Sequence, residues 1–393
     1  MNKASQNIKK VIPYGKQDIV NDDIEEVINI LKSDFLTQGP TVPLFEKTVS
    51  TYCGANHAIA ANSGTSALHI AALALGVGHG DIVWTSPNTF VASANCILYC
   101  GANVDFVDID KRTFNLCPEK LELKLIEAEK NDRLPKVVIP VHIAGQPCDM
   151  KEIHRLSQKY GFRIIEDASH ALGALYNEEK VGNCLYSDFT IFSFHPVKII
   201  TSGEGGMALT NNSDLARKAR LFSSHGITSD GDEMDARPDD EIWNYQQIAL
   251  GFNYRMTDIH AALGISQMKR LDKFLSRRRE LAKRYDEMLC DLPVTIPFQE
   301  SNSLSSYHLY LLSVQSELQR KVFDALLEDK INANLHYIPV YRQPYFVKLG
   351  FNQGYCQNSE EYFKSVITIP LYPGLSDSDQ NRVIKSIAKA VSK

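Results

Sequence analysis

The residue of this chain best suited to covalent chemistry is Lys198. It follows the apolar run Asp188–Phe194, which is typical of a buried strand, and precedes the glycine-rich segment Thr201–Gly206. Burial of an ammonium group costs free energy and lowers its pKa. A lysine of lowered pKa is a nucleophile toward carbonyl carbons, as a Schiff base with pyridoxal phosphate requires. Most lysines are solvated surface residues, and that alternative applies to Lys198 taken alone.

An acidic residue stands where such a cofactor would need one. Asp167 directly follows the apolar strand expected at Arg163–Glu166 and precedes Lys198 by 31 positions. The pyridine nitrogen of pyridoxal phosphate requires an acidic partner, and a carboxylate at the end of a strand suits that role. Lys198 and Asp167 are therefore the candidate catalytic pair.

A third group of residues could hold a phosphate. In the segment Asn62–Leu68, a turn of small residues opens an alanine-rich helix, so that free backbone N–H groups and hydroxyls gather at the helix start. The alternative is an ordinary N-capped helix. Ser193, five residues before Lys198, could add a hydroxyl, or could be a strand-edge serine. Taken with Lys198 and Asp167, the segment predicts a phosphate site for the same cofactor.

The elements that must position these residues alternate between strands and helices. The pattern predicts a helix at Asn21–Lys32, capped by Asn21, and a helix at Thr65–Leu75. Further expected elements are His57–Ala61, Ile82–Thr85, Ala92–Tyr99, Val104–Val107, Val137–Pro140, Ile153–Tyr160 and Arg163–Glu166. Such alternation indicates an α/β fold with a mixed, mostly parallel sheet covered by helices, which binds ligands at the carboxyl ends of its strands.

The last third of the chain has a different pattern. The acidic stretch 229–241 is expected to form a loop and could act as a lid. A helical pattern capped by Thr257 continues toward Leu289 and is long enough to bridge two domains. A strand at Tyr307–Val314, a helix at Leu318–Leu327, the segment Ile331–Leu335 and a final helix then indicate a smaller α+β domain. We therefore expect a cofactor-binding domain at 1–257 and a linking helix with a small domain at 258–393.

Composition excludes several other classes of protein. The chain has 393 residues, of which 44% are hydrophobic and 23% charged, with a net charge of −5. The chain has no stripe of basic residues, so nucleic acid is not expected as a partner. It also has no apolar run of about 18 residues, so a membrane span is not expected. The polar N-terminus does not have the pattern of a signal peptide. The eight scattered cysteines show no metal-ligand spacing and favour reduced thiols in a cytoplasmic protein with no metal site.

Several segments together resemble the DegT/StrS family of sugar-nucleotide aminotransferases. The resemblance runs from about residue 12 to the end of the chain and implies the type I aspartate-aminotransferase fold with pyridoxal 5′-phosphate as cofactor. The matching segments are Leu36–Pro40, Asn62–Leu68, Thr89–Ala92, Glu166–Ala174, Phe192–Lys198 and Gly251–Asp258. One departure is the absence of an arginine before the turn Ser224-His225-Gly226.

The resemblance implies a role for each matched residue. Lys198 would hold the cofactor covalently and then move protons, while Asp167 would keep the pyridine nitrogen protonated. Phe90 would stack on the ring, although it could equally be a core aromatic. His170 would reach the phenolic oxygen, or be a structural histidine. The residues implied to bind the phosphate are Gly64, Thr65, Ser66 and Ser193.

The resemblance also implies partners. Asn253 would reach the cofactor phosphate of a neighbouring subunit, which makes the active unit a homodimer with shared sites; the alternative is a turn asparagine. Residues that resemble the lining of the sugar-nucleotide groove are Tyr14, Gln38, Tyr307, His308, His336 and Tyr337.

Two segments, His195–Gly206 and His336–Tyr345, resemble most the members that aminate UDP-linked sugars on the route to pseudaminic acid. The expected reaction moves the amino group of L-glutamate to the 4-keto carbon of a UDP-linked 6-deoxy N-acetyl sugar. A GDP- or dTDP-linked 4-keto-6-deoxy sugar is the alternative substrate. A non-catalytic protein that keeps the fold is an alternative of another class, which the combination of Lys198, Asp167, Ser193 and Asn253 disfavours.

Overall fold

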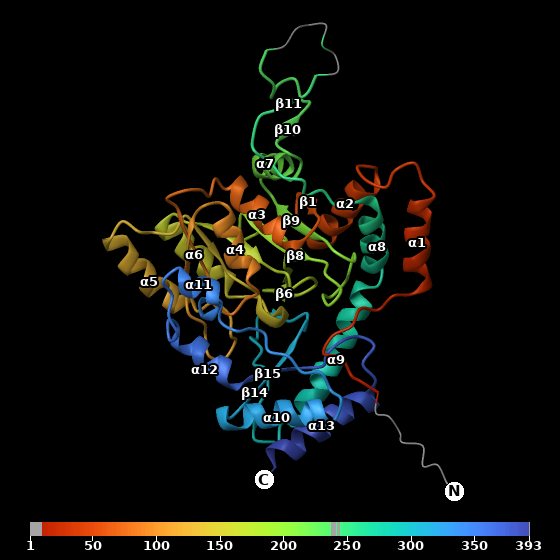
Figure 1. Ribbon diagram of the computed structural model, residues 1–393, viewed down its shortest axis with the longest axis vertical. Coiled ribbons are helices and arrows are strands. Elements are labelled where there is room, and N and C mark those ends of the chain that lie inside the picture. Colours follow the sequence, from red (N-terminus) through yellow and green to blue (C-terminus); the bar gives the residue numbers. More distant parts are fainter. Residues whose placement is uncertain (1–9, 237–240, 242–243, 393) are drawn as a thin grey trace.

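The computed structural model describes residues 10–236, 241 and 244–392, and its centre is a seven-stranded sheet (Figure 1). Only β9 runs antiparallel to both of its neighbours, and the remaining pairings are parallel, as the alternating pattern predicts. In sheet order the strands are β1 (His57–Ala61), β9 (Gly206–Thr210), β8 (Phe189–Ser193), β5 (Arg163–Asp167), β4 (Val137–Ile139), β2 (Ile82–Thr85) and β3 (Asn103–Phe106).

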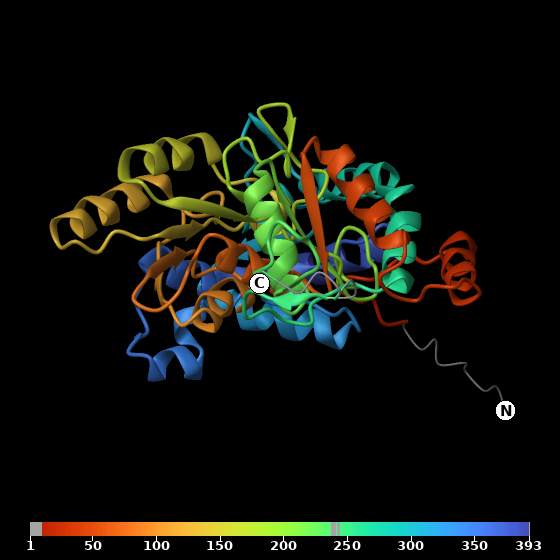
Figure 2. The same ribbon diagram turned by 90° about the horizontal axis from the view of Figure 1, so that it is seen from above.

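Helices cover both faces of this sheet, as Figure 2 shows from above. The central strands β4, β5, β8 and β9 are therefore buried along nearly their whole length. Such strands are made of almost continuous apolar residues, because neither face meets water. The covering helices include α2 (Thr41–Cys53), α3 (Gly64–Ala74), α4 (Ala92–Tyr99), α5 (Pro118–Lys130), α6 (Met150–Tyr160), α7 (Ser213–Ser223) and α8 (Asp258–Met268).

Side-chain caps decide where several of these helices begin. Ser63 accepts from the backbone N–H of Ser66 at the start of α3, and Thr257 accepts from that of His260 at the start of α8, as expected for Thr257. In α1 (Asn21–Leu31) the expected cap is wrong. The N-cap residue is Val20, whose backbone N–H donates to Asp23 Oδ2, because the buried carboxylate of Asp23 reaches back to it.

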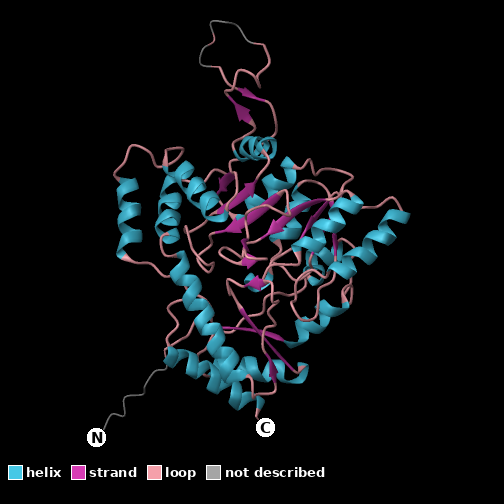
Figure 3. Cartoon of the chain, turned by 180° about the vertical axis from the view of Figure 1, so that it is seen from behind, coloured by secondary structure: helices cyan, strands magenta, loops and turns pink. Residues whose placement is uncertain are grey.

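The C-terminal part is a smaller α+β unit, seen below the main sheet in Figure 1 and, from behind, in Figure 3. The long helix α9 (Leu271–Leu289) leads into it. An antiparallel sheet of three strands has α10 and α13 against it, and their apolar side chains form one core. These elements are β12 (Val294–Thr295), β14 (Tyr310–Val314), α10 (Ser316–Glu328), α11 (Pro344–Lys348), α12 (Gln357–Ser365), β15 (Val366–Ile369) and α13 (Asp377–Val391).

One expectation for the C-terminal third needs correction. The helical pattern from Thr257 to Leu289 does not form one helix, since α8 ends at Met268 and α9 begins at Leu271. The segment Ile331–Leu335 makes isolated bridges, from Ile331 to Ile12 and from Asn334 to Thr368. Periodicity reports which face is apolar, but it does not report a change of helix direction.

A narrow arm projects from the main body at the top of Figure 1. Its described part pairs β10 (Ile227–Thr228) with β11 (Gln246–Gln247) in antiparallel fashion. A Cβ at Gly226 would lie 1.9 Å from the carbonyl oxygen of Ala249 and would collide with it. The two segments of the arm therefore lie close together at its base. The arm contains the acidic stretch predicted as a loop, of which 237–240 lie outside the described residues.

The boundary predicted at 257/258 falls directly before α8. This helix packs against α1 and α2, whereas α9 carries the chain to β14 and β15. None of the described helices is both long and apolar enough to cross a bilayer. The remaining short strands, β6 (Leu175–Tyr176), β7 (Glu179–Lys180) and β13 (Ser303–Leu304), form a separate small sheet.

Asp258, at the start of α8, caps the start of another helix, α2, with its side chain. Its fully buried carboxylate accepts hydrogen bonds from the backbone N–H groups of Gly39 and Thr41, both at 2.8 Å, and of Val42 at 3.3 Å. We expect Asp258→Ala to lower the free energy of unfolding by about 3 kcal/mol, because buried N–H groups at the start of α2 lose a charged acceptor. Denaturant unfolding measures the change. The exposed Asp34→Ala is the control, and an equal loss in both variants would contradict the assignment.

Candidate active site

The carboxyl ends of β5 and β8 bring the predicted catalytic pair together. These strands are parallel neighbours, with Asp167 in register with Ile191. Asp167 is the last residue of β5, and Ser193 is the last residue of β8. Lys198 follows in a turn in which its backbone N–H donates to the carbonyl oxygen of His195. The two side chains therefore meet at the edge of the sheet where α/β folds bind ligands.

The environment of Lys198 makes it a nucleophile. Desolvation lowers the pKa of its amine to about 8, and the nearby negative charge of Asp167 acts in the opposite direction. The side chain lines a narrow pocket together with Arg278, Gln267 and Lys16. An amine with this pKa is partly neutral near physiological pH, as covalent chemistry on a carbonyl carbon requires.

Asp167 is held by donors on both oxygens. Its Oδ2 accepts from the Ser93 hydroxyl at 2.6 Å, and its Oδ1 accepts from the Ser169 backbone N–H at 3.1 Å. The preceding residue of β5 is also held, because the Glu166 carboxylate lies 2.8 Å from His142 Nε2. Asp167 therefore has a fixed orientation, as is needed for a carboxylate that must meet one atom of a ligand.

The residues predicted to bind the phosphate (Gly64, Thr65, Ser66 and Ser193, called the phosphate cup below) come together where α3 begins beside the end of β8. The first-turn amides of Gly64 and Thr65 have no acceptor within their own helix. A Cβ at Gly64 would lie 3.0 Å from Ser193 Cβ, so the start of α3 is in contact with Ser193. A glycine is needed at position 206 for β9 to lie this close to the start of α3, since a Cβ there would come within 2.2 Å of the Ser63 carbonyl oxygen. Free N–H groups, hydroxyls and a helix dipole then meet at one point.

Ser66 is less available than the other residues of the cup. Its hydroxyl donates to Asn62 Oδ1 at 2.6 Å and lies 2.9 Å from the Ser63 hydroxyl. The helix is thus capped as the simpler alternative supposes, but the amides of Gly64 and Thr65 donate to no group among the described residues. Capping and anion binding are compatible here.

A wall of aromatic and histidine side chains stands beside Lys198 and Asp167. His170 is in contact with His308, with ring centroids 4.4 Å apart, and its Nε2 lies 3.1 Å from the Tyr337 hydroxyl. Because His170 Nδ1 accepts from the Ala144 backbone N–H, the ring proton lies on Nε2 and is donated to Tyr337. The wall continues through His336 to Tyr14.

The histidines of this wall are neutral at physiological pH. Burial lowers the pKa of His170 and His308 well below the usual value, and lowers that of His336 to about 3. The positive charge of Lys198 contributes to all three shifts. The wall therefore offers hydrogen-bonding groups without adding positive charge.

Phe90 is not a core aromatic, which removes one of the two alternatives for it. Its side chain is 59% exposed, and its ring centroid lies 6.2 Å from that of Tyr337. An exposed phenylalanine beside the wall leaves a ring face available for stacking with a ligand.

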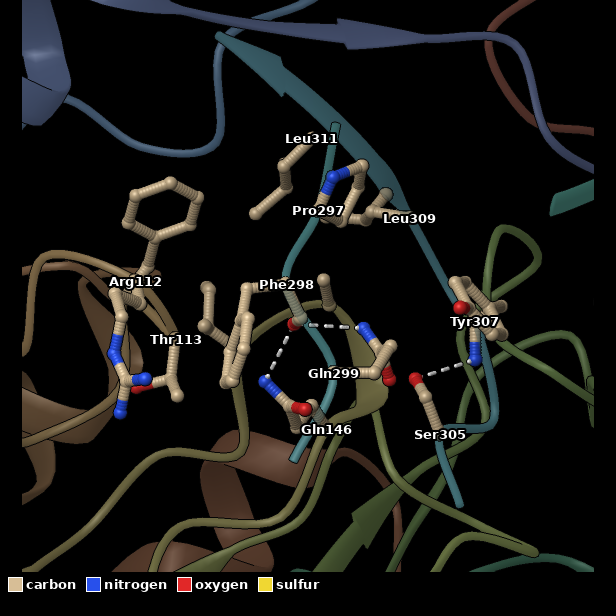
Figure 4. Close-up of a pocket in the computed structure, with 13 residues that line it drawn as sticks. Arg112, Thr113, Gln146, Pro297, Phe298, Gln299, Ser305, Tyr307, Leu309 and Leu311 are labelled. Atoms are coloured by element: carbon tan, nitrogen blue, oxygen red, sulfur yellow. Dashed lines mark hydrogen bonds between the residues drawn. The ribbon is translucent and has the colours of Figure 1, made fainter. Parts of the chain in front are cut away.

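Two predicted groove residues lie apart from this cluster. Gln38 is exposed in the loop that Asp258 caps. Tyr307 packs against the C-terminal core and lines a different pocket, of about 310 Å³ (Figure 4). Figure 4 shows the Gln146 and Gln299 amides directed to the Phe298 carbonyl oxygen there. The roles expected of Gln38 and Tyr307 in binding substrate stay predictions.

Asn253 lies exposed at the base of the arm. Its carbonyl oxygen accepts from the Asn62 side-chain amide at 3.4 Å, so it adjoins the start of the phosphate cup. Nearby, Arg255 donates to the Ser224 hydroxyl at 3.0 Å. The turn Ser224-His225-Gly226 has no arginine directly before it in the sequence, but this contact places the Arg255 guanidinium beside it.

Two supporting residues escaped the sequence analysis. Ser93 lies directly after the matched segment Thr89–Ala92, but a serine early in a helix carries no sign of a distant carboxylate partner. Arg278, which is 1% exposed, donates to the carbonyl oxygens of Tyr307, His308 and Leu371. Desolvation lowers its pKa to about 10. It fixes the backbone that carries His308.

Comparison with known proteins gives consistent matches over nearly the whole chain. The model of the DegT/DnrJ/EryC1/StrS aminotransferase family matches residues 17–388. The spore coat polysaccharide biosynthesis protein SpsC of Bacillus subtilis is 38% identical over 387 residues, which are 97% of either chain. A UDP-4-amino-4,6-dideoxy-N-acetyl-β-L-altrosamine transaminase of Campylobacter jejuni is 38% identical over 388 residues, which are 98% of either chain.

Solved structures show the same fold. Helicobacter pylori PseC, an aminotransferase of pseudaminic acid biosynthesis, has a TM-score of 0.88 and 30% identity, with 97% of this chain and 99% of that chain covered. The putative sugar aminotransferase Spr1654 of Streptococcus pneumoniae in its PLP form has a TM-score of 0.87 and 28% identity, with 97% and 99% covered. These relatives are aminotransferases of fold type I, as expected for this chain.

The cofactor is pyridoxal 5′-phosphate. The described residues fit it: Lys198 offers a partly neutral amine, Asp167 a fixed carboxylate, and the start of α3 open amides beside Ser193. The exposed ring of Phe90 is placed to cover a planar group. His308 Nδ1, which is buried and has no partner among the described residues, is a further polar atom in the same cluster.

The pKa of Lys198 predicts how the apoprotein captures its cofactor. We expect the rate of covalent capture of pyridoxal phosphate to rise with pH, to reach its midpoint near 8 and to level off above it, because only the neutral amine reacts. Asp167→Asn should move the midpoint to lower pH, since a negative charge that stabilises the ammonium is lost.

Borohydride reduction at timed intervals, followed by peptide mass spectrometry, measures capture at Lys198. Asp149→Asn, which alters a carboxylate bonded to Tyr176, is the control. A label on another lysine, or a midpoint near the usual lysine pKa, would contradict the assignment.

Proposed function

This chain belongs to the DegT/DnrJ/EryC1/StrS aminotransferase family, and we propose that it transfers the amino group of L-glutamate to carbon 4 of a UDP-linked 6-deoxy-4-keto N-acetyl sugar. That the chain is a sugar aminotransferase follows from its family and relatives. The choice of a UDP-linked sugar is supported by similarity to the Campylobacter jejuni transaminase and to Helicobacter pylori PseC. The observation that carries the proposal is Lys198, a lysine of lowered pKa beside the fixed carboxylate of Asp167.

The side chains of this chain divide the work of the reaction. Bound pyridoxal phosphate supplies an electron sink, in which charge from the reacting carbon is delocalised. Asp167 stabilises positive charge at the ring nitrogen, and its fixed orientation makes that contact pre-formed. Lys198 Nζ moves a proton to or from the reacting carbon, a task suited to an amine whose pKa is about 8.

The histidine wall and Phe90 suit the recognition of a sugar. Neutral imidazoles at His336 and His308 can donate to and accept from sugar hydroxyl and keto oxygens without competing charge. The half-buried Tyr14 and Tyr337 present apolar ring surface beside them. We therefore assign the sugar to the side of the site that these residues form.

The relatives do not all point to one substrate. The Bacillus subtilis spore coat protein is as similar to this chain as the Campylobacter jejuni transaminase, at 38% identity over nearly the whole length, and its name specifies polysaccharide biosynthesis without a nucleotide. A GDP- or dTDP-linked 4-keto-6-deoxy sugar is kept as the alternative substrate.

A panel of nucleotide keto sugars distinguishes these substrates. With L-glutamate as donor, we expect kcat/KM for UDP-2-acetamido-2,6-dideoxy-β-L-arabino-hex-4-ulose to exceed that for GDP- and dTDP-linked 4-keto-6-deoxy sugars at least tenfold, or about 1.4 kcal/mol. Mass spectrometry of the amino-sugar products and of 2-oxoglutarate follows the reaction. Lys198→Ala is the inactive control. Faster turnover of a GDP- or dTDP-linked sugar would assign the chain to the alternative class.

The active unit in this proposal is a homodimer with shared sites. Asn253 is exposed at the base of the projecting arm, next to the phosphate cup. Large apolar side chains are also exposed in the N-terminal segment that carries α1 and the start of α2, and a second copy could cover them. They include Ile19, Val20, Ile24, Leu31, Phe35, Leu36 and Leu44.

Subunit mixing tests the shared site. We expect inactive Lys198→Ala chains and inactive Asn253→Trp chains to regain activity when mixed, because one site of the mixed dimer then carries neither change. As the reciprocal control, an excess of the doubly substituted chain should inactivate the wild type, since each mixed site then carries one change. Activity is measured after subunit exchange has been verified by mass. Absence of rescue, with wild-type activity preserved in the control, would place Asn253 at the site of its own chain or outside any site.

A further inference from the structure

A chain of buried hydroxyl groups leads to Asp167 from the start of α4. The Ser93 hydroxyl lies 2.6 Å from Asp167 Oδ2, and the Thr89 hydroxyl lies 2.7 Å from Ser93 Oγ. All three side chains are buried. Hydrogen bonds that involve a charged group in such surroundings are among the strong ones.

The direction of donation in this chain follows from the charge on Asp167. An ionised carboxylate only accepts, so Ser93 must donate its single proton to Asp167. Thr89 must then donate to the Ser93 oxygen. The positive charge of Lys198 favours this state, because it interacts with a negative Asp167.

The segment that carries Thr89 and Ser93 is itself anchored. The Pro87 carbonyl oxygen accepts from the Val340 backbone N–H at 3.0 Å, and the Asn88 side chain bonds to the Ser359 hydroxyl. Ser93 lies in the first turn of α4, where the positive end of the helix dipole also favours a nearby carboxylate. The loop is thus held from the C-terminal part while it orients a carboxylate in the main sheet.

We propose that Ser93 is a positioning residue, which holds the Asp167 carboxylate in the orientation that meets the ring nitrogen of the cofactor, with Thr89 orienting Ser93 in turn. This inference rests on the proposed contact of Asp167 with that nitrogen. Ser93 occupies one side of Oδ2 and the Ser169 amide occupies Oδ1, so the carboxylate cannot rotate without breaking both bonds. Loss of the Ser93 hydroxyl would leave Asp167 Oδ2 without this donor. The carboxylate could then rotate, and its orientation toward the ring nitrogen would be less well defined.

The test is a double-mutant cycle on cofactor affinity, measured by titration of the apoprotein with pyridoxal phosphate. We expect Ser93→Ala to weaken binding about tenfold, the scale of one hydrogen bond to a charged group. Ser93→Thr, which keeps the hydroxyl, should restore most of the affinity, and Thr89→Val should weaken binding about threefold. In an Asp167→Asn background Ser93→Ala should have little further effect, because the two residues then no longer act as a unit.

A spectroscopic readout separates orientation from a general loss of structure. We expect the pH dependence of the visible absorbance of the bound cofactor to change in Ser93→Ala, and to stay unchanged in Ser157→Ala. Ser157 is a buried serine on α6 whose hydroxyl bonds, among the described residues, only to the carbonyl oxygen of His154. If Ser93→Ala does not fold, Thr89→Val and Ser93→Thr still report on the same chain of bonds.

The outcomes separate this inference from the proposal on which it rests. An Asp167→Asn protein that binds the cofactor as the wild type does would overturn the assigned contact of Asp167. A strong effect of Asp167→Asn with wild-type behaviour of Ser93→Ala would overturn only the role of Ser93. An equal loss from Ser93→Ala with and without Asp167 would also overturn it, because Ser93 would then act independently of the carboxylate.

Discussion

The electrostatic interaction of Lys198 with Asp167, in surroundings that desolvate the amine, is the constraint on which the rest of the site depends. Burial alone would lower the pKa of the amine further, and a solvated lysine would keep its usual pKa. The combination leaves Lys198 with a pKa of about 8, so that the charged and the neutral form are both accessible near neutrality. A group that must bond covalently and then move protons needs both forms.

The fold meets this constraint through strand pairing. Parallel pairing of β5 with β8 places Asp167 and Ser193 at one edge, and antiparallel β9 returns Gly206 to the start of α3. Short turns then suffice to bring Lys198 to the same edge. In the proposed site, separate groups next to a rigid sheet would thus meet the cofactor's ring nitrogen, aldehyde and phosphate, and attachment to a rigid sheet favours precise placement.

The histidines around this edge carry no charge. Desolvation keeps His170, His308 and His336 neutral, while the buried Arg278 donates to backbone carbonyl oxygens. Protonation of a histidine in this wall would lower the pKa of Lys198 further, because like charges disfavour each other's charged form. Neutral donors and acceptors are therefore the suitable lining for a sugar substrate, and the chain Thr89–Ser93 supports Asp167 by hydrogen bonding without an added cation.

Local patterns in the sequence determined much of this protein. The order of strands and helices, the cap at Thr257, and the choice of Lys198 and Asp167 follow from apolar periodicity and from residue types at strand ends, because these features depend on neighbours along the chain. The exposure of Phe90, the break between α8 and α9, the cap at Val20 and the contacts of Ser93 and Arg278 were decided by the tertiary structure. Ser93 and Arg278 bond to groups tens of residues away, and Asp23, the acceptor of the Val20 cap, is held by Ser266 and Arg270 more than two hundred residues away. Only packing of the whole chain selects which distant groups meet.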